Sequence, residues 1–424
     1  MTTQISLAKF SINSRQYSIL KNQIEIKRLD LFSQLSKTEF YPKVYWSHRD
    51  EEESRIAFGK ILGSFRIPTI KLKEMIAGPS FDLRFYGGRS FEGCPNKKSL
   101  FESFRRQYFF LPKYEIIQKK EGTFLNLYEI ATGDLDAKEI TRPPLFDEAL
   151  DDTLNYQVTD FKHIPTYAVW DKQITSLIHD IQTKKLDKAV IARQSSLSLN
   201  QEVNPYALLK KLQGSFLKSS FFCFQFKATH SFLGATPECL YSRNNSYLKT
   251  EAIAGTADLL KKTNLLESDK EVDEFSYVTQ FLSGALKKIS SNLLKSRDKT
   301  VNVGYLKHLY SQFEAKLKPN VTDQNIIDSL FPSPALSGYP QDKALSKINE
   351  LEDFNRDWYA SPIGCISESR AELIIAIRSC LIAKLKVHLF VGNGIVKDSN
   401  PKKEWEELDI KMSPFLKLFN HESH

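Results

Sequence analysis

Hydrophobic residues in the second half of the chain follow two spacings, which predict two kinds of element. Short runs rich in β-branched and aromatic residues predict strands, namely KAVIAR, SFFCFQF, AELIIAIRSCLI and KVHLFVG. The last two runs predict a hairpin that turns at residues 383–386. Long segments with helical spacing separate the runs, so the pattern indicates a mixed architecture, either α/β or α+β.

One predicted helix covers residues 267–294. Its apolar residues fall on one stripe at helical spacing: Phe275, Val278, Leu282, Ala285 and Ile289. Glu271 continues this stripe and Glu274 projects about 60° from it, so two carboxylates lie on or beside the face that should be buried. Acids in a first helical turn are also favourable when they stay in water. Both interpretations remain open, because a buried carboxylate needs a cation or hydrogen-bond donors.

A second helix is predicted from Asn400, a good N-cap residue, and Pro401, which suits the first helical position. Glu407 and Lys411 stand one turn apart and away from the apolar stripe, with Glu404 beside them. Taken alone, this spacing is typical of a solvated ion pair.

Five further residues stand out by their neighbours. Gly392 and Gly394 lie between a predicted strand and the helix cap, where glycine lets a ligand approach the backbone, although a plain tight turn has the same pattern. Lys188 and Arg378 are single charges inside apolar strands. A buried lysine can act as a base, and arginine offers a fixed fork to a carboxylate, but either side chain could also end at an exposed edge. Glu238 follows a proline between two short strands.

The best candidate for a boundary is the segment 133–160, which combines two adjacent prolines with a run of acids. It separates an N-terminal region, residues 1–150, from a larger region, residues 160–420. No internal repeat or low-complexity tract is present.

Composition excludes several classes of protein. With 424 residues, 41% hydrophobic residues and 17 each of Gly and Pro, the chain predicts a packed, enzyme-sized body. Five cysteines without a C-x-x-C pair predict neither a disulfide framework nor a thiolate zinc site. The net charge of +8 is dispersed, so a nucleic-acid partner is not expected. The longest apolar stretch, residues 373–385, is too short to cross a membrane, and we expect a cytoplasmic protein.

The order of the motifs is more informative than any single one. The chain carries KAVIAR, GATPE, TEAIAGTA, S-x-K-E-x-x-E, FPSPALSGYP, E-x-F-x-R-x-x-Y, AIRS and VGNGIV-x-x-S-x-P-x-x-E-W-x-E-x-x-x-K in that order. This series, over residues 185–415, resembles the chorismate-utilising enzymes. The TEAIAGTA form, YWSHRDEEE and FYGGRSF look most like the isochorismate synthases of menaquinone biosynthesis. The resemblance implies an α+β fold of two stacked, mainly antiparallel sheets flanked by helices, to which the N-terminal region adds strands.

The resemblance also implies roles for particular residues. Enzymes of this kind add water at carbon 2 of chorismate while the hydroxyl at carbon 4 leaves, with Mg²⁺ holding a substrate carboxylate. Lys188 matches the general base and Glu238 the general acid. Glu274 and Glu407 match the magnesium ligands, and Glu271 and Glu404 support the metal shell. The residues that match substrate contacts are Gly255, Thr256, Tyr359, Arg378, Gly394 and Lys411.

Four positions depart from the pattern of these enzymes. Phe275 and Phe331 stand where histidines are usual, Asn393 where alanine is usual and Asp357 where glycine is usual. Salicylate synthase, which shares the base, acid and metal positions, therefore stays an alternative, as does other chorismate chemistry. A non-catalytic scaffold that binds anions is a further alternative. Neither the oligomeric state nor the pathway, menaquinone or siderophore, can be deduced from the sequence.

Overall fold

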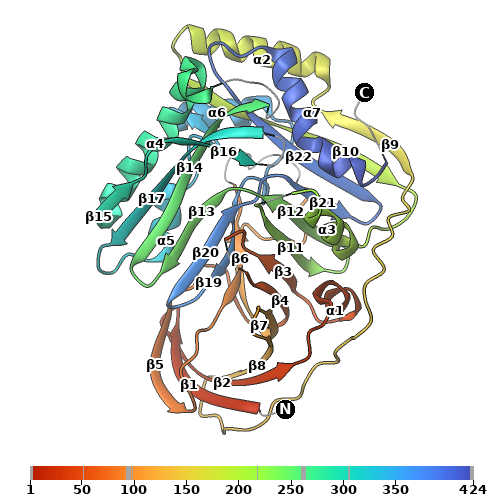
Figure 1. The fold of residues 1–424 in the computed structure, drawn as a ribbon, viewed down its shortest axis with the longest axis vertical. Helices are drawn as coiled ribbons and strands as arrows, with labels where there is room; N and C mark the ends of the chain where they lie inside the picture. Colours follow the sequence, from red (N-terminus) through yellow and green to blue (C-terminus); the bar gives the residue numbers. More distant parts are fainter. Residues whose placement is uncertain are drawn as a thin grey trace.

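The computed structural model describes residues 3–50, 52–91, 97, 99–216, 218–258, 264–303 and 306–420. Its strands belong to one antiparallel network that divides at β7 (Gln107–Gln118) into two arms (Figure 1). β7 pairs along one edge with β4 and along the other with β6 and β8. The predicted α+β architecture with two antiparallel sheets is confirmed.

The first arm begins at β4 and ends at the outer strand β9. Its strands, in spatial order, are β4 (Ser54–Ser64), β3 (Lys43–Ser47), β11 (Ser220–Lys227), β12 (His230–Thr236), β21 (Ser379–Ala383), β22 (Lys386–Ile395), β10 (Lys188–Leu199) and β9 (Val158–Ile164). The short β18 (Gly338–Tyr339) also pairs with the start of β10.

The second arm begins at β6 and ends in a hairpin region around β17. Its strands, in spatial order, are β6 (Phe85–Arg89), β19 (Pro362–Ile366), β20 (Arg370–Ile375), β13 (Cys239–Asn244), β14 (Tyr247–Asp258) and β17 (Leu306–Leu317), with β15 (Ser290–Lys295) and β16 (Lys299–Val303) both on β17.

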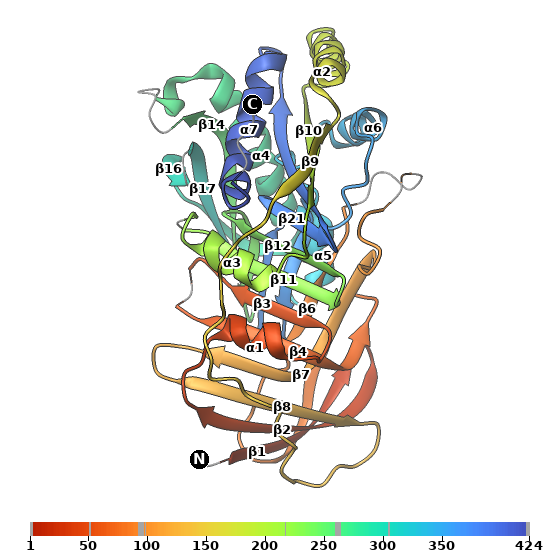
Figure 2. The same cartoon turned by 90° about the vertical axis from the view of Figure 1, so that its right-hand side faces the viewer.

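The remaining strands extend the network beyond β7, at the end of the molecule that carries the N-terminus (Figure 2). They run in the order β8 (Thr123–Ala131), β2 (Arg15–Ile26), β1 (Thr3–Ile12) and β5 (Ile70–Ala77). Strands of residues 1–150 therefore pair with later strands at two places, β3 with β11 and β6 with β19. The segment 132–157 holds no helix or strand, and its role as a boundary stays a prediction.

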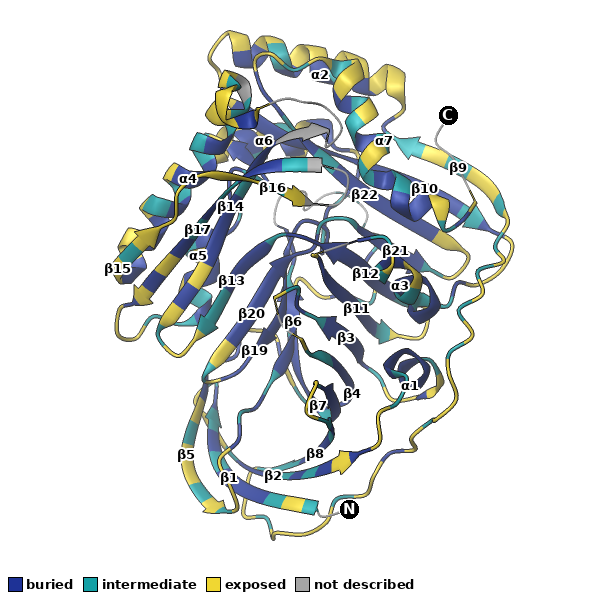
Figure 3. Cartoon of the chain, in the orientation of Figure 1, coloured by how far each residue is buried: buried dark blue, intermediate teal, exposed yellow. Residues whose placement is uncertain are grey.

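Most helices cover the end of the molecule opposite the N-terminus (Figure 1). The helices are α1 (Leu31–Lys37), α2 (Tyr167–Gln182), α3 (Pro205–Gln213), α4 (Asp269–Ile289), α5 (Asp323–Leu330), α6 (Gln341–Leu351) and α7 (Pro401–Lys417), with a 3₁₀ turn at Leu265–Glu267. α4 packs on β14 and β17, whereas α7 packs on β22 and α6 on β10. Each arm therefore carries its own helices. Figure 3 shows exposed residues along the outward faces of α2 and α4, whereas β10 and β22 are mostly buried.

Local signals predicted two of these helices, α4 and α7, although α4 ends at Ile289 and residues 290–294 of the predicted helix belong to β15. The apolar stripe of α4 is buried, and Asn400 caps α7, where its side chain accepts a hydrogen bond from the Lys403 amide (3.1 Å). The hairpin of β21 and β22 turns where the sequence predicts. No helix among the described residues is long and apolar enough to cross a membrane.

One predicted strand is wrong. The run AELIIAIRSCLI forms two strands, β20 and β21, because the backbone bends between them at Arg378, whose φ of 48° lies in the left-handed region. Strand geometry ends where φ turns positive. The bend passes the chain from the second arm to the first, and it places Arg378 between them.

Candidate active site

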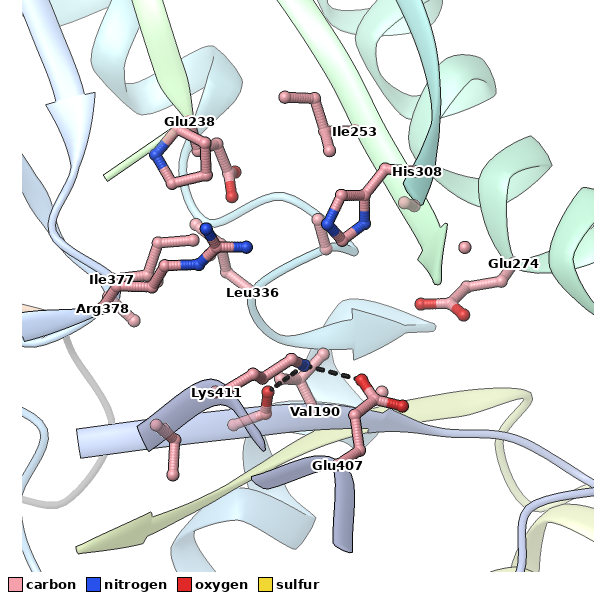
Figure 4. A pocket seen from close by; sticks show the side chains of 18 of the residues that line it. Val190, Glu238, Ile253, Glu274, His308, Leu336, Ile377, Arg378, Glu407 and Lys411 are labelled. Carbon is pink, nitrogen blue, oxygen red and sulfur yellow. Dashed lines mark hydrogen bonds and ion pairs between the residues drawn. The ribbon is translucent and has the colours of Figure 1, made fainter. Parts of the chain in front are cut away.

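A cavity lies between the two arms (Figure 4). Val190, Gly392 and Gly394 line it from β10 and β22 of the first arm. Ile253, Gly255 and His308 line it from β14 and β17 of the second arm. Charged side chains from α4, α7 and the two strand bends complete the lining, so one concave site gathers residues from distant parts of the sequence.

Two lysine–carboxylate pairs occupy the side of the cavity formed by α4, α7 and β10. The Lys188 Nζ lies 2.7 Å from Glu274 Oε1, and the Lys411 Nζ lies 2.8 Å from Glu407 Oε1. Lys188 is almost fully buried, and Glu274 keeps only 16% of its side chain exposed. The solvated interpretation of Glu274 is therefore wrong, since this carboxylate faces the cavity and a buried cation.

Glycine is required at two places in this lining. A Cβ on Gly394 would lie 2.8 Å from Lys188 Cε and 2.9 Å from Glu274 Oε1, so only glycine leaves room for that ion pair. Gly255 has φ 69°, and a Cβ there would also crowd Glu271 at about 3.1–3.2 Å. Both predicted glycines therefore shape the cavity directly.

A buried amide joins the lysine and carboxylates of α7. Asn393 Nδ2 donates to the Glu404 carbonyl (2.7 Å) and to Glu404 Oε2 (3.1 Å). Asn393 Oδ1 accepts from Lys411 Nζ (2.5 Å), which also donates to the Gly392 carbonyl (3.0 Å). The asparagine that replaces the usual alanine is thus built into the site. It fixes the ammonium group of Lys411.

The opposite side of the cavity holds Glu238 and Arg378, each in a bend between strands (Figure 4). The pKa of Glu238 is raised to about 8, because burial and the nearby Glu251 carboxylate raise it by more than Lys188, Arg49 and Arg378 lower it. Burial lowers the pKa of Arg378 to about 10, and Glu238 partly offsets this effect. Among the described residues no side chain or carbonyl accepts a hydrogen bond from the Arg378 guanidinium. An anion is the natural partner for such a buried fork.

Two further residues, Tyr359 and Thr256, are predicted to contact the substrate. Tyr359 is buried, stacks on Phe390 with ring centroids 5.2 Å apart, and lines the cavity. Burial raises the pKa of its hydroxyl well above the usual range, so it stays a neutral donor. The backbone of Thr256 pairs with His308 in β14 and β17, but its side chain lies outside the described residues.

Sequence reasoning missed His308. It belongs to none of the sequence motifs named above, so the sequence predicts no role for it. The structure buries it against the cavity, where burial, followed by Arg378 and Lys411, lowers its pKa to about 3. It is therefore a neutral imidazole at physiological pH. No local signal in the sequence identifies it.

The motif E-x-F-x-R supports the strand that carries Lys188. Arg356 donates to the carbonyls of Val190 (2.7 Å) and Leu336 (2.8 Å) and pairs with Glu352. Glu352 in turn accepts from the Ala192 amide (2.8 Å). This buried pair therefore holds β10 through the Val190 carbonyl and the Ala192 amide, and Arg356 also lines the cavity.

The other departures from the family pattern are accommodated without disturbing the cavity charges. Phe275 is buried in the stripe of α4, and Phe331 packs edge-on against Phe91 with ring centroids 5.7 Å apart. Asp357 adopts φ 47°, the left-handed conformation for which glycine is usual and which aspartate tolerates better than most residues. None of the three lines the cavity.

The carboxylates fit a hard divalent cation by their chemistry. Glu271, Glu274, Glu404 and Glu407 all line the same cavity and offer only oxygen atoms. Within the described residues no three acidic, histidine or cysteine side chains converge on one point as a complete metal site. Mg²⁺ does not need one, because it usually keeps several waters and binds through one or two carboxylates plus its substrate.

The fold and the cavity define a class of protein that the family comparison identifies. The model of the chorismate binding enzyme family matches residues 4–420, so the chain belongs to this family. It is 30% identical over 372 residues to the isochorismate synthase MenF of Bacillus subtilis, spanning 83% of this chain and 77% of that protein. It is 27% identical over 423 residues to the MenF isochorismate synthase of Haemophilus influenzae, spanning 95% and 92%.

Solved structures agree on the fold. The menaquinone-specific isochorismate synthase MenF of Escherichia coli superposes with a TM-score of 0.78 at 23% identity, covering 98% of this chain and 96% of that one. Anthranilate synthase component I of Streptococcus pneumoniae superposes with a TM-score of 0.68 at 18% identity, covering 86% and 92%. Two differently named enzymes share this fold, so the fold by itself does not define the reaction.

Proposed function

We propose that this protein is an isochorismate synthase that converts chorismate to isochorismate for menaquinone biosynthesis. The observation that carries the proposal is a cavity lined on one side by Glu274, whose carboxylate binds the buried Lys188 (2.7 Å), and on the other by Glu238, whose carboxyl is protonated because its pKa is raised to about 8. Adding water at one ring carbon while a hydroxyl leaves another requires a base and an acid at separate points. Membership of the chorismate-binding family and the relatives named isochorismate synthase support the same reaction.

Lys188 serves as the base. Its ammonium group is held by Glu274, whose carboxylate stands 2.7 Å away and is itself part of the proposed metal site. In its neutral amine form, after the ammonium has given up one proton, Lys188 takes a proton from water as the oxygen bonds to carbon 2. Its position in β10, fixed from behind by Arg356, keeps the nitrogen at one point of the cavity.

Glu238 serves as the acid. Because burial raises its pKa to about 8, it is protonated at neutral pH and can donate to the hydroxyl that leaves carbon 4. Water is then lost from carbon 4 as water is gained at carbon 2, so the reaction is an isomerisation. The cation of Arg378 beside Glu238 stabilises the carboxylate that forms.

Substrate carboxylates are bound by the fixed donors of the cavity. Arg378 offers a guanidinium fork, Lys411 an ammonium anchored by Asn393, and Tyr359 a neutral hydroxyl. The absence of side chains at Gly255 and Gly394 lets a substrate ring approach the backbone closely, and Thr256 follows Gly255 in β14. These contacts orient chorismate between the base and the acid.

The metal site is assigned to Glu274 and Glu407, with Glu271 and Glu404 supporting them. When bound, Mg²⁺ compensates the two carboxylates and provides a fixed positive contact for a substrate carboxylate. Asn393 holds Glu404 by two hydrogen bonds and so orients that support. A cytoplasmic location, chorismate as the sole small-molecule partner and the use of isochorismate for menaquinone belong to the same proposal.

The test is to identify the products that the purified protein forms from chorismate, with and without Mg²⁺, by chromatography against isochorismate, salicylate and anthranilate standards. Isochorismate alone, formed only with Mg²⁺, is the expected result. If salicylate and pyruvate were formed, the cavity would still be the active site, but the enzyme would be a salicylate synthase. No turnover in a folded sample with Mg²⁺ would instead favour the non-catalytic scaffold.

A further inference from the structure

Glu238 sits in a link of two residues between β12 and β13, and its own backbone is held on both sides. Its amide donates to Thr236 Oγ1 (3.2 Å), and its carbonyl accepts from the Ile375 amide (3.0 Å). The flanking residues, Pro237 and Cys239, therefore decide which way the carboxyl points. The backbones of Pro237 and Cys239 are both hydrogen-bonded by one ion pair, which is formed by two residues distant in the sequence.

That ion pair joins the N-terminal region to β14. Arg49 follows β3, and its guanidinium donates both to the Pro237 carbonyl and to Glu251 Oε2. The other carboxylate oxygen of Glu251, Oε1, accepts from the Cys239 amide (2.9 Å). Both side chains are largely buried, with exposed fractions of 13% for Arg49 and 4% for Glu251. The pair thus contacts the backbone immediately before and immediately after Glu238.

We propose that Arg49 and Glu251 are positioning residues that together fix the backbone on both sides of Glu238 and balance the charge beside its carboxyl group. The inference rests on the proposed function, because it gives Glu238 its role as the acid. It adds to that function two residues outside the predicted site, one of them in the N-terminal region. Neither residue lines the cavity, so both act through Glu238.

The charges of Arg49 and Glu251 both act on the pKa of Glu238, which can be measured. Glu238 is faced by Glu251 on β14, Lys188 on β10, Arg49 after β3 and Arg378 before β21. Glu251 raises the pKa of Glu238, whereas each of the three cations lowers it. His308 and Glu271 line the same cavity from β17 and α4. Arg49 and Glu251 act on the pKa of Glu238 in opposite directions, so each offsets part of the effect of the other, and removing either partner leaves the other uncompensated.

The two single substitutions therefore predict opposite effects. Glu251→Gln leaves the cation of Arg49, lowers the pKa of Glu238 and moves the alkaline fall of kcat/KM to lower pH. Arg49→Gln leaves the anion of Glu251 and moves that fall to higher pH. The double variant restores the midpoint. All three variants lose the contacts on one or both flanks, so kcat at the optimum falls by about 10- to 100-fold.

The experiment is the pH profile of kcat/KM for isochorismate formation by the full-length protein and these variants. Arg49→Lys keeps the charge but not the fork, so it should retain the wild-type midpoint with reduced kcat. Arg243→Gln is the matched control, because Arg243 and Asp323 form another buried pair (2.9 Å, both 9% exposed) that does not contact the link. It should lower thermal stability without moving the profile.

The outcomes separate this inference from the proposed function. A wild-type protein that forms no isochorismate refutes the proposed function. A wild-type protein that forms it, with both single variants folded and sharing the wild-type midpoint, refutes only the positioning pair. Should Arg49→Gln fail to fold, Arg49→Lys and Glu251→Gln still decide the question, because equal midpoints in the three proteins overturn the proposal and a downward shift in Glu251→Gln alone supports it.

Discussion

The two sides of the cavity hold their charges in different ways. On the side of α4 and α7, Glu274 and Glu407 are carried by helices and each already pairs with a lysine. On the other side, Glu238 and Arg378 sit in bends between strands, with their backbones bound and their pKa values moved by burial. The first side can exchange partners when a cation and a substrate arrive. The second side is fixed in advance, as an acid and an anion-binding fork require.

The same contrast separates the chemistry. Carboxylates that pair with lysines are ionised and suited to a hard cation. A carboxyl group whose pKa is raised to about 8 is neutral at pH 7 and suited to proton donation. Two glutamates in one cavity thus acquire opposite tasks from their surroundings. The protein surroundings of each glutamate therefore decide whether it can bind a cation or donate a proton.

The largest expected effect comes from removing the acid or the base. Lys188→Ala and Glu238→Gln should each lower kcat by about 10²- to 10⁴-fold, because each removes a proton-transfer group. Steady-state kinetics of isochorismate formation measure this. Lys43→Met is the control, since it removes another buried lysine, which donates to the Leu35 carbonyl (2.9 Å) away from the cavity. Near wild-type turnover in Lys188→Ala would contradict its role.

The next effect concerns the metal side. Glu404→Gln disturbs a buried carboxylate that Asn393 orients beside the proposed ligand Glu407. The Mg²⁺ concentration needed for half-maximal activity should rise by about 10- to 100-fold, as for other residues that support metal ligands. Glu406→Gln changes an exposed glutamate on the same helix and should leave it unchanged. Calorimetric titration with Mg²⁺ checks both variants, and equal affinities would refute the assignment.

A smaller effect is expected for substrate binding on the fixed side. Arg378→Lys keeps a positive charge but loses the fork, so KM for chorismate should rise about tenfold, which corresponds to one charged hydrogen bond of roughly 1.5 kcal/mol. Arg370→Lys, at the exposed start of β20, is the matched control. If KM were unchanged and only kcat fell, Arg378 would act on the leaving hydroxyl and not on a carboxylate.

The mildest perturbation is pH itself. The pKa of Glu238 is raised to about 8, so the group is protonated below that pH and ionised above it. Because the acid must hold its proton, kcat/KM should fall tenfold per pH unit above about 8. The residual activity of Glu238→Gln should lack this alkaline fall. A wild-type profile that stays level to pH 10 would show that Glu238 is not the acid.

Local signals account for what the sequence predicted correctly. Asn400 and Pro401 define the start of α7, and the spacing of Phe275 and Val278 defines the buried face of α4, because caps and periodicity are local. The fold and the cavity residues followed from a resemblance between ordered motifs. Neither composition nor spacing alone would have gathered Lys188, Glu238 and Glu274 into one site.

Long-range geometry accounts for what was missed. The bend at Arg378 needs a positive φ at a residue other than glycine, which no local pattern predicts. His308 is buried and lines the cavity, a position that depends on how β17 is placed in the folded chain. Arg49 and Glu251 are 202 residues apart, and their pairing depends on where the residues after β3 and those of β14 lie in the folded chain. Such contacts are properties of the tertiary structure.

The central claim is that water enters at carbon 2 as the hydroxyl leaves carbon 4, between Lys188 and Glu238. The most direct measurement is to run the reaction with Mg²⁺ in ¹⁸O-labelled water and to analyse the product by mass spectrometry. The account predicts isochorismate carrying one ¹⁸O atom, on carbon 2. Isochorismate without the label would contradict it, because the hydroxyl would then have moved within the substrate and no water would have been activated.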